Sequence, residues 1–288
     1  MSAPPPARFT RRTLLKVAGG ALLASLSAAG YALRVEPRWL DVTQIDIPIA
    51  NLAPHLIGRR LAQLSDIHLS PYMSVAHLDS AIDMVNSLAP DWLFLTGDFV
   101  GRDVTYATGL IDPLRKLDMP AYAVWGNHDH WTSTTTVAQS LAESSVTLLE
   151  NAGIRLDSNL WLAGSDNIWG GRPDLNAALA GARPDDTTIL LVHEPDFFDR
   201  VLEQDAPVSL QLSGHTHGGQ VRLPQLSSSA GGLRSWAPVL PRYGVRYPIG
   251  HHTIDNRHVY TNRGLGVWPV RIRLNCRPEL TIFTLQAA

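Results

Sequence analysis

Three predicted strands, each followed by a cluster of polar residues, constrain the fold of this chain most strongly. The strands are residues 59–64, 91–96 and 121–125, and predicted helices around residues 78–88 and 110–117 separate them. Alternating strands and helices with short connections imply parallel strands joined by right-handed crossovers. The clusters then lie together at the carboxyl-terminal edge of one sheet, where open α/β sheets bind ligands. We therefore expect an α/β fold with a polar site at this edge.

The polar clusters contain residue types that bind metals or transfer protons. They are Ser65-Asp66-Ile67-His68, Gly97-Asp98 and Gly126-Asn127-His128-Asp129. A fourth apolar strand, residues 188–192, leads directly into another histidine, His193. Unrelated loops would rarely all carry such residues at the same end of their strands.

A glycine-rich stretch with two histidines, Gly214–Gln220, follows the apolar run Val208–Leu212. Residues i and i+2 of extended backbone point to the same side, so His215 and His217 can face one target together. The flanking glycines remove side-chain bulk and allow close approach to the backbone. Taken alone, the stretch is equally compatible with a surface turn that carries two incidental histidines.

The rest of the chain predicts further elements of the same domain. We expect an edge strand at residues 42–49, closed by Pro48, because proline is tolerated at sheet edges. Residues 225–250, rich in Ser, Gly, Pro and Arg, are expected to be irregular. No internal repeat or linker divides the chain, so residues 35–288 form one predicted domain. The other expected elements are a helix at 134–150, strands at 160–164, 258–262 and 279–285, and a short helix ending at residue 180.

The first 34 residues are predicted to lie outside that domain. Thr10-Arg11-Arg12-Thr13-Leu14-Leu15-Lys16 contains the paired arginines of a twin-arginine export signal, and residues 17–33 form an uncharged apolar run. A basic amphipathic helix is a weaker interpretation, because the run has no polar face. Small residues permit cleavage, but an uncleaved membrane anchor is equally open, although the run is short for a full span.

Charge and cysteine content exclude several classes of protein. Residues 1–34 hold five basic residues and no acidic ones, so their removal would shift the formal net charge from −2 to about −7. A negative surface argues against sequence-independent binding of nucleic acids, which needs a basic surface. Cys276 is the single cysteine, which rules out an internal disulfide and a thiolate-rich metal site.

The residues at the strand ends suit two divalent metal ions. Carboxylate, amide and imidazole donors fit Mn, Fe, Zn or similar ions. Their number exceeds what one ion with four to six ligands needs, and suits two ions about 3.5–4 Å apart. A buried core of hydrogen-bonded polar residues is the competing interpretation, but it would need many independent partners. The candidates are Asp66, His68, Asp98, Asn127, His128, His193, His215 and His217.

In this order, Asp-x-His, Gly-Asp, Gly-Asn-His-Asp, a single His and Gly-His-Thr-His resemble the motifs of the calcineurin-like metallophosphoesterases. The chain is most similar to an exported bacterial branch of phosphodiesterases, which shares a Gly-His-Thr-His-Gly-Gly-Gln run and a late Arg-Gly-Leu-Gly stretch, here residues 263–266. The resemblance covers roughly residues 40–288. It implies a four-layer α/β/β/α sandwich of two mixed sheets with the metal site at the strand carboxyl ends.

The resemblance also implies a role for each site residue. One metal would be held by Asp66, His68 and His217, and the other by Asn127, His193 and His215, with Asp98 bridging both. Manganese is the favoured metal, and a hydroxide shared by the ions would be the nucleophile. His128 would lie over the phosphate and stabilise its charge or protonate the leaving oxygen. Asp129 would orient His128, unless it serves as a cap for its loop.

The expected function is hydrolysis of a phosphoester, either a phosphodiester or a lipid-linked pyrophosphate such as UDP-2,3-diacylglucosamine. The alternative is a catalytically idle metal-binding protein that acts at the cell envelope through protein or cell-wall contacts. A nuclease is disfavoured by the acidic balance of the mature part.

Partners and location follow from the N-terminus and from the loop at 225–250. We expect export by the twin-arginine machinery to the periplasm or the outer face of the cytoplasmic membrane, with a membrane surface as a possible contact. In the loop, Arg234, Arg242 and Arg246 either line an anionic pocket or are simply solvated, and Trp236, Tyr243, Tyr247 and Trp268 either contact lipid or bases or pack the loop. Four histidines that match no motif are expected to be surface or packing residues: His130, His251, His252 and His258.

Overall fold

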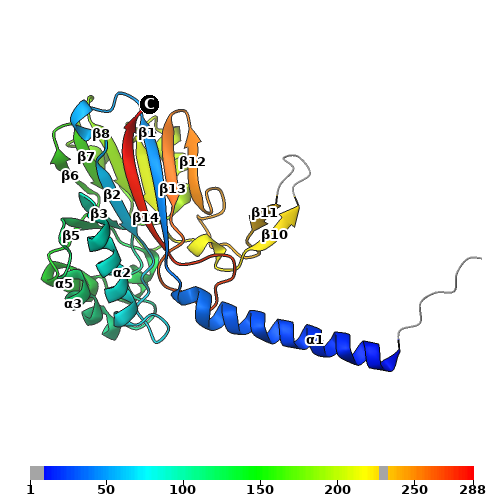
Figure 1. Cartoon of the computed structure of the whole chain (residues 1–288). Helices are drawn as coiled ribbons and strands as arrows, with labels where there is room; N and C mark the ends of the chain where they lie inside the picture. The colour runs from blue at the N-terminus through cyan, green and yellow to red at the C-terminus, as the bar shows by residue number, and fades with distance from the viewer. Residues whose placement is uncertain (1–9, 227–232) are drawn as a thin grey trace, which may run out of the picture.

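The computed structural model describes residues 10–226 and 233–288, in which two six-stranded sheets pack face to face (Figure 1). The first sheet has the strand order β1-β14-β2-β3-β4-β5 and the second the order β12-β13-β9-β8-β7-β6. The first sheet contains β1 (Asp41–Ile49), β2 (Arg60–Leu64), β3 (Trp92–Leu95), β4 (Ala121–Ala123), β5 (Thr147–Leu148) and β14 (Glu279–Ala287). The second contains β6 (Ala152–Asp157), β7 (Leu160–Gly164), β8 (Thr187–Leu191), β9 (Leu210–Ser213), β12 (Gly250–Ile254) and β13 (Arg257–Thr261).

Both sheets are mixed, and each has a parallel centre. In the first sheet β2, β3, β4 and β5 are parallel, whereas β14 runs antiparallel to β2 and parallel to the edge strand β1. In the second, β7, β8, β9 and β13 are parallel, and β6 and β12 are antiparallel to their neighbours. The parallel strands that sequence alternation predicts are therefore confirmed.

Helices cover the outer face of each sheet, which completes the predicted four-layer sandwich. The first sheet is covered by α2 (Val75–Leu88), α3 (Ile111–Leu114) and α5 (Thr134–Glu143), and the second by α6 (Leu175–Leu179) and α7 (Phe198–Glu203). Strand β3 shows how the layers arise: Leu93 and Leu95 pack against the helices, whereas Trp92 and Phe94 join the core between the sheets. This alternation is that of a strand buried on both faces.

Some elements differ from the expectation. Helix α5 ends at Glu143 rather than near residue 150, because Ser145 has a φ of 60° and the chain then enters β5. Helix α3 spans only Ile111–Leu114 and follows a 3-10 segment, η4 (Val104–Leu110). The strands β6 and β12 were not predicted, and the stretch expected to be irregular contains a hairpin of β10 (Leu223–Leu226) and β11 (Leu233–Trp236).

The N-terminal segment forms a helix, α1 (Arg11–Gly30), that projects from the sandwich (Figure 1). It continues through a π-helical turn (Tyr31–Val35) and a 3-10 turn (Glu36–Arg38) without leaving helical geometry. Residues Arg11–Arg38 are long and apolar enough to cross a membrane, although a signal sequence has the same character. The predicted boundary at residue 34 therefore falls inside a continuous helical segment.

Candidate metal centre

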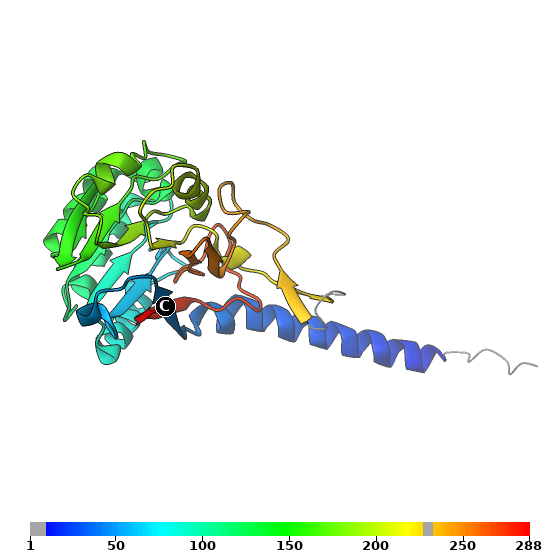
Figure 2. The same ribbon diagram turned by 90° about the horizontal axis from the view of Figure 1, so that it is seen from above.

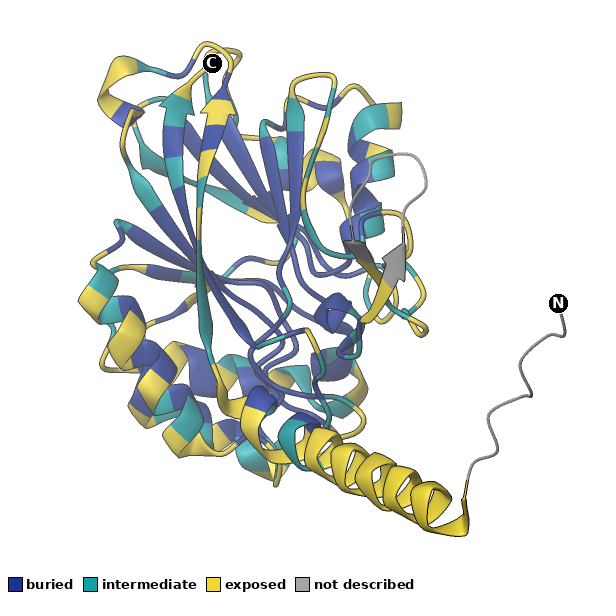
Figure 3. Ribbon diagram, turned by 45° about the vertical axis from the view of Figure 1, so that its right-hand side comes forward, coloured by how far each residue is buried: buried dark blue, intermediate teal, exposed yellow. Residues whose placement is uncertain are grey.

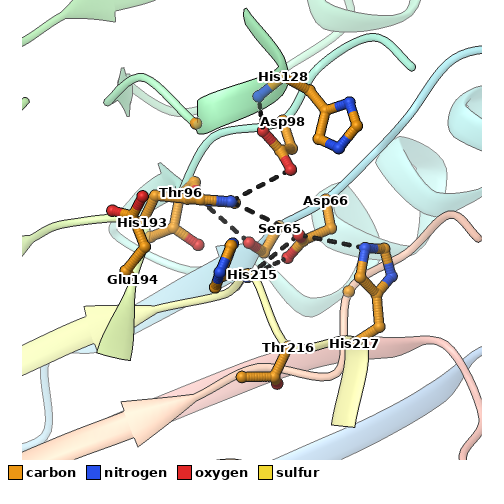
Figure 4. Close-up of polar contacts among 12 residues, drawn as sticks. Ser65, Asp66, Thr96, Asp98, His128, His193, Glu194, His215, Thr216 and His217 are labelled. Carbon is orange, nitrogen blue, oxygen red and sulfur yellow. Dashed lines mark hydrogen bonds and ion pairs between the residues drawn. The ribbon is translucent and has the colours of Figure 1, made fainter. Parts of the chain in front are cut away.

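The candidate metal ligands come together at the carboxyl-terminal ends of β2, β3, β8 and β9 and at the start of α4 (Asn127–Thr132), as Figure 4 shows for most of them. All are buried, with Asp66, His68 and His193 fully inaccessible to solvent. Loops that are far apart in the sequence thus build one compact site, at the edge of the sheets that the sequence predicts.

Asp66, His68 and His217 form one group of donors. His217 Nε2 lies 3.1 Å from His68 Nε2 and 3.4 Å from Asp66 Oδ1. His68 Nε2 lies 4.0 Å from the same Asp66 oxygen. One ligand atom from each residue therefore falls within the space that a single metal ion needs.

Asp98 connects this group to a second one around His193. Asp98 Oδ2 lies 3.4 Å from His68 Nε2 and 3.2 Å from His193 Nε2. The ring of His215 is 5.0 Å from that of His193, measured between centroids. The neighbouring histidines of the Gly214–Gln220 stretch thus associate with different groups, His217 with His68 and His215 with His193.

The backbone is strained at these donors. Asp66, His68, Asp98, His215 and His217 all have a positive φ, between 47° and 71°. Left-handed backbone is uncommon for residues other than glycine and costs on the order of 1–3 kcal/mol each where the region is sparsely populated. Such residues persist when the surrounding fold imposes them, and they gather at functional sites.

Two glycines allow the donor loops to approach one another. A Cβ atom at Gly126 would collide with the Asp98 carboxylate, and one at Gly214 would collide with Ser65 and with Asp66. Both positions therefore admit no side chain while the loops stay where they are. Steric exclusion of a Cβ atom thus explains why the Gly-Asn-His-Asp and Gly-His-Thr-His motifs begin with glycine.

The Arg-Gly-Leu-Gly stretch at residues 263–266 supports Asp66 from the other side. Leu265 N donates to the carbonyl of Ser65 and Gly266 N to the carbonyl of Asp66, both at 2.8 Å. A Cβ atom at Gly264 would lie 2.8 Å from the Asp66 Cβ. This stretch therefore fixes the left-handed conformation of Asp66 through its backbone.

Hydrogen bonds at the outer nitrogens set the tautomers of three imidazoles. His193 Nδ1 donates to Thr96 O at 2.7 Å, His215 Nε2 to Arg242 O at 2.8 Å, and His128 Nδ1 to Gly101 O at 3.0 Å. Burial lowers the pKa of His128 and of His215, so these rings are neutral and their other nitrogen carries a lone pair. Although burial opposes it, the Asp98 carboxylate raises the pKa of His193, so that ring must lose a proton before it can bind a metal.

The structure fits bound cations better than a self-satisfied polar core. The buried Asn127 Oδ1 has no hydrogen-bond partner among the residues that the structure describes, and His193 Nε2 has only its ion-pair contact with Asp98 Oδ2, at 3.2 Å. Burial lowers the pKa of His215 to about 3 and that of His217 well below its usual value, so both rings are neutral and present lone pairs. Buried lone-pair atoms without a partner, next to two carboxylates, raise the free energy of the folded protein unless a cation binds them.

Asp129 does not contact the His128 ring; of the two predicted roles, its hydrogen bonds fit that of a loop cap. The Asp129 carboxylate accepts from the backbone N–H groups of Asp98, Phe99 and Gly126, each at 2.9 Å. It therefore serves as the loop cap, and the carbonyl of Gly101 orients the His128 ring instead. Through the cap, Asp129 holds the backbone of Asp98, and His128 N in turn donates to Asp98 Oδ1 at 2.8 Å.

A cavity of about 560 Å³ opens from the donors toward the outside of the domain. Its inner end is lined by polar donors that include His68, Asp98 and His128. Its outer wall is apolar and consists of Trp131, Trp169, Val221, Pro238, Val239, Leu240, Pro241, Trp268, Pro269, Val270 and Ile272, among others. The site is thus a polar floor under an apolar wall.

Aromatic residues surround His128 at the entrance to the floor. The Trp268 ring centroid lies 4.6 Å from that of His128, and Trp131 lies 4.9 Å from it on another side. Trp169 packs edge-on against Trp131, with 4.9 Å between centroids. Neither Trp131 nor Trp169 belongs to a motif in the sequence, although Trp131 lies one helical turn after His128, and this spacing places the two side chains side by side on a helix.

A family model described as calcineurin-like phosphoesterase matches residues 59–219, more than half of the chain. The chain belongs to the calcineurin-like phosphoesterase family. It is 36% identical to an uncharacterized metallophosphoesterase, YkuE, of Bacillus subtilis, over 97% of this chain and 99% of the relative. It is 30% identical to the phosphodiesterase YaeI of Escherichia coli (96% and 99% covered) and 29% identical to the UDP-2,3-diacylglucosamine pyrophosphatase LpxG of Chlamydia muridarum (88% and 91% covered).

Membership in the calcineurin-like phosphoesterase family makes the chain a hydrolase, and the family depends on two metal ions, which the clustered donors can hold.

The histidines and arginines that lie outside the metal-binding cluster make contacts elsewhere in the domain. His130 pairs with Asp166 at 2.7 Å, and His258 Nε2 donates to the carbonyl of Pro48, on β1 of the first sheet, at 2.8 Å. Arg246 forms an ion pair with Asp199, and the Arg242 guanidinium lies 4.6 Å from the Tyr243 ring centroid. The Arg234 side chain lies outside the part of the chain that the structure describes.

Proposed function

We propose that the chain hydrolyses a phosphodiester or a lipid-linked pyrophosphate such as that of UDP-2,3-diacylglucosamine. The observation that carries this proposal is the cavity: its floor is a cluster of buried metal-binding donors beside His128, and its outer wall is apolar. A charged phosphate suits the floor, and an apolar or aromatic substituent suits the wall. Similarity to a phosphodiesterase and to a UDP-2,3-diacylglucosamine pyrophosphatase supports both substrate classes.

Seven side chains hold the two ions in this proposal. Asp66, His68 and His217 would hold the first ion, and Asn127, His193 and His215 would hold the second. Asp98 would be shared by both, since its carboxylate lies between His68 and His193. When bound, the two ions, manganese in the favoured case, supply a water that is deprotonated near neutral pH and positive charge that stabilises the phosphate in the transition state.

His128 is the residue that acts on the substrate. Burial lowers the pKa of its imidazole to about 4 in the free protein. A phosphate bound beside the ring adds negative charge, which favours the protonated form. Because Nδ1 is held by the Gly101 carbonyl, the additional proton resides on Nε2, where it can stabilise the phosphate or pass to the leaving oxygen. Asp129 contributes by fixing the loop that carries Asp98.

The N-terminal segment determines where the reaction takes place. Residues 1–34 act as a twin-arginine signal or an anchor, and residues 35–288 as the catalytic domain, at the periplasm or the outer face of the cytoplasmic membrane. The exposed apolar helix α1 and the paired Arg11 and Arg12 support this assignment. The export machinery and a membrane surface are then partners.

A substrate panel combined with elemental analysis tests the proposal. The purified full chain, loaded with Mn²⁺, is assayed on bis(p-nitrophenyl) phosphate, p-nitrophenyl phosphate and UDP-2,3-diacylglucosamine, with chelator-stripped protein as control. We expect about two metal ions per chain, turnover of a diester or of the pyrophosphate, and no turnover after stripping. Two bound ions without turnover of any of the three substrates would favour the idle metal-binding alternative.

A further inference from the structure

A hairpin outside both large sheets carries apolar side chains into solvent. Strands β10 and β11 pair only with each other among the described strands, and Leu223 lies directly opposite Trp236. Leu223 is 38% and Trp236 44% exposed. A two-stranded hairpin is marginally stable alone in water, and a cross-strand apolar pair stabilises it most when something covers that pair.

The apolar surface continues from this hairpin to the mouth of the cavity. Val239 and Val270 line the cavity and are 74% and 56% exposed, so they face the outside as well as the interior. We call Leu223, Trp236, Val239 and Val270 the apolar rim. Exposed apolar side chains that gather at one site on a soluble surface indicate an interaction surface.

Helix α1 indicates what covers the rim. Its side chains from residue 11 to residue 28 are all exposed, including Leu15 at 73% and Leu23 at 67%. A helix that is apolar all round is stable when a protein core or a membrane surrounds it. In Figures 1 and 2, α1 and the β10–β11 hairpin leave the sandwich on the same side.

The residues that directly follow α1 are docked on the segment that carries Val270. The Ala32 carbonyl accepts from Arg273 N at 3.0 Å, and the buried Glu36 carboxylate accepts from Cys276 N at 2.5 Å. The Arg277 guanidinium lies 3.6 Å from the Trp39 ring centroid. Figure 3 shows that the exposed helix meets the buried body of the domain at this junction. The helix therefore cannot reorient freely relative to the rim.

We propose that α1 is retained as a membrane anchor and that the apolar rim rests in the headgroup region of the bilayer that holds it, so that the cavity opens onto the membrane surface. The partner is a lipid bilayer, and the surface is independent of which ester the floor cleaves. Tryptophan and aliphatic side chains suit the boundary between headgroups and acyl chains. The docked helix fixes which face of the domain turns toward the lipid.

Site-specific fluorescence tests the rim in the full chain. Val239→Cys and Val270→Cys are each labelled with a nitrobenzoxadiazole probe and reconstituted into vesicles of phosphatidylethanolamine and phosphatidylglycerol. The native Cys276 is 1% exposed and is left in place. Asp112→Cys on α3, with a side chain 89% exposed on the outer helical layer, is the matched control.

We expect the probes at positions 239 and 270 to be quenched at least twofold by lipids that carry a spin label near the headgroup, and the probe at 112 to be quenched little. Equal, weak quenching at all three positions would overturn the proposal. Lipid quenching reports contact with lipid, so a probe that only enters the protein's own cavity does not give this result.

A second pair of variants separates the rim from catalysis. Trp236→Glu lies outside the cavity and is expected to leave turnover of bis(p-nitrophenyl) phosphate within twofold while it halves or further lowers lipid quenching of the probe at 270. Met84→Glu, an exposed apolar position on α2 that is 40% exposed, should change neither measurement. Unchanged quenching in Trp236→Glu would exclude Trp236 from the lipid contact. Absence of turnover in the unsubstituted chain would refute the proposed function and leave the quenching result intact.

Discussion

The floor and the wall of the cavity differ in polarity, in burial and in backbone conformation. The floor consists of buried ionisable donors from both sheets, held in left-handed backbone by close glycine contacts and by the 263–266 stretch. The wall consists of apolar side chains from a few loops, several of them half-exposed. The floor therefore has almost no freedom to change, whereas the wall can vary without disturbing the donors. We therefore expect the chemistry to depend on the floor and the choice of substrate to depend on the wall.

The same difference explains how each region is stabilised. Two carboxylates and several imidazoles without water are unfavourable in a protein interior unless cations or hydrogen bonds compensate them. The carboxylate of Asp98 raises the pKa of His193 well above its usual value although burial lowers it, and the same negative potential attracts metal ions. The wall needs no such compensation of charge, because its residues are apolar.

The largest expected effect comes from removing the charge that links the two halves of the floor. Asp98→Asn keeps an acceptor for the His128 N–H, which is 2.8 Å away, but replaces a carboxylate by a neutral amide. We expect loss of at least one of the two ions by elemental analysis and a fall in kcat of about a thousandfold or more, since bound ions contribute several kcal/mol to the transition state. Retention of both ions with near-normal turnover would remove Asp98 from the bridging position.

His128 tests whether the floor binds metal only or also catalyses. His128→Ala removes a ring that has no place in the proposed ligand set, so both ions should be retained. We expect kcat to fall by about 10²–10⁴-fold, which is typical for loss of a general acid. His251→Ala, an exposed histidine on β12, is the control and should be unaffected. An unchanged kcat in His128→Ala would support the idle metal-binding alternative.

The fold was largely predictable from sequence because its signals are local. The apolar strands β2, β3, β8 and β9 end directly at Asp66, Asp98, His193 and the Gly214–Gln220 stretch, so strand polarity alone gathers these residues at one edge. The strands β6 and β12 were missed because they pair at the sheet edges and are only partly buried, which weakens their hydrophobic pattern.

The geometry of the site was predictable only in part. The donor residues could be named from their positions after strands, but the left-handed backbone at Asp66 depends on contacts with Leu265 and Gly266, about two hundred positions further along the chain. The assignment of Asp129 shows the same limit: adjacency to His128 suggested a pairing, whereas its carboxylate binds three backbone N–H groups. Tertiary contacts decided between two roles that the sequence left open.

The wall predicts an effect on binding that leaves the floor intact. Trp169 is held by Glu194, whose carboxylate accepts from Trp169 N at 3.2 Å, and its ring packs against Trp131. Trp169→Ala should raise KM for a diester with aromatic or acyl substituents about three- to tenfold, since an aromatic contact contributes about 0.5–1.5 kcal/mol. Metal content and kcat should stay within about twofold. Trp236→Ala, outside the cavity, is the control, and equal changes in both variants would contradict a specific role of the wall.

The smallest expected effect concerns the contact that joins floor and wall. His130 on α4, next to the floor, pairs with Asp166, whose loop leads to Trp169 in the wall; Nε2 and Oδ1 are 2.7 Å apart. The hydrogen bond to Asp166 raises the pKa of His130. A raised folded-state pKa gives stability that is fully present below the unfolded value of about 6.5 and is lost as pH rises through the folded value. His130→Gln should therefore lower Tm by about 2–4 °C at pH 6, for a pair contributing about 1 kcal/mol, and by less at pH 9. A double-mutant cycle with Asp166→Asn gives the interaction energy between the two side chains. A Tm difference that is the same at both pH values would show that packing of the His130 ring, and not its charge, stabilises this contact.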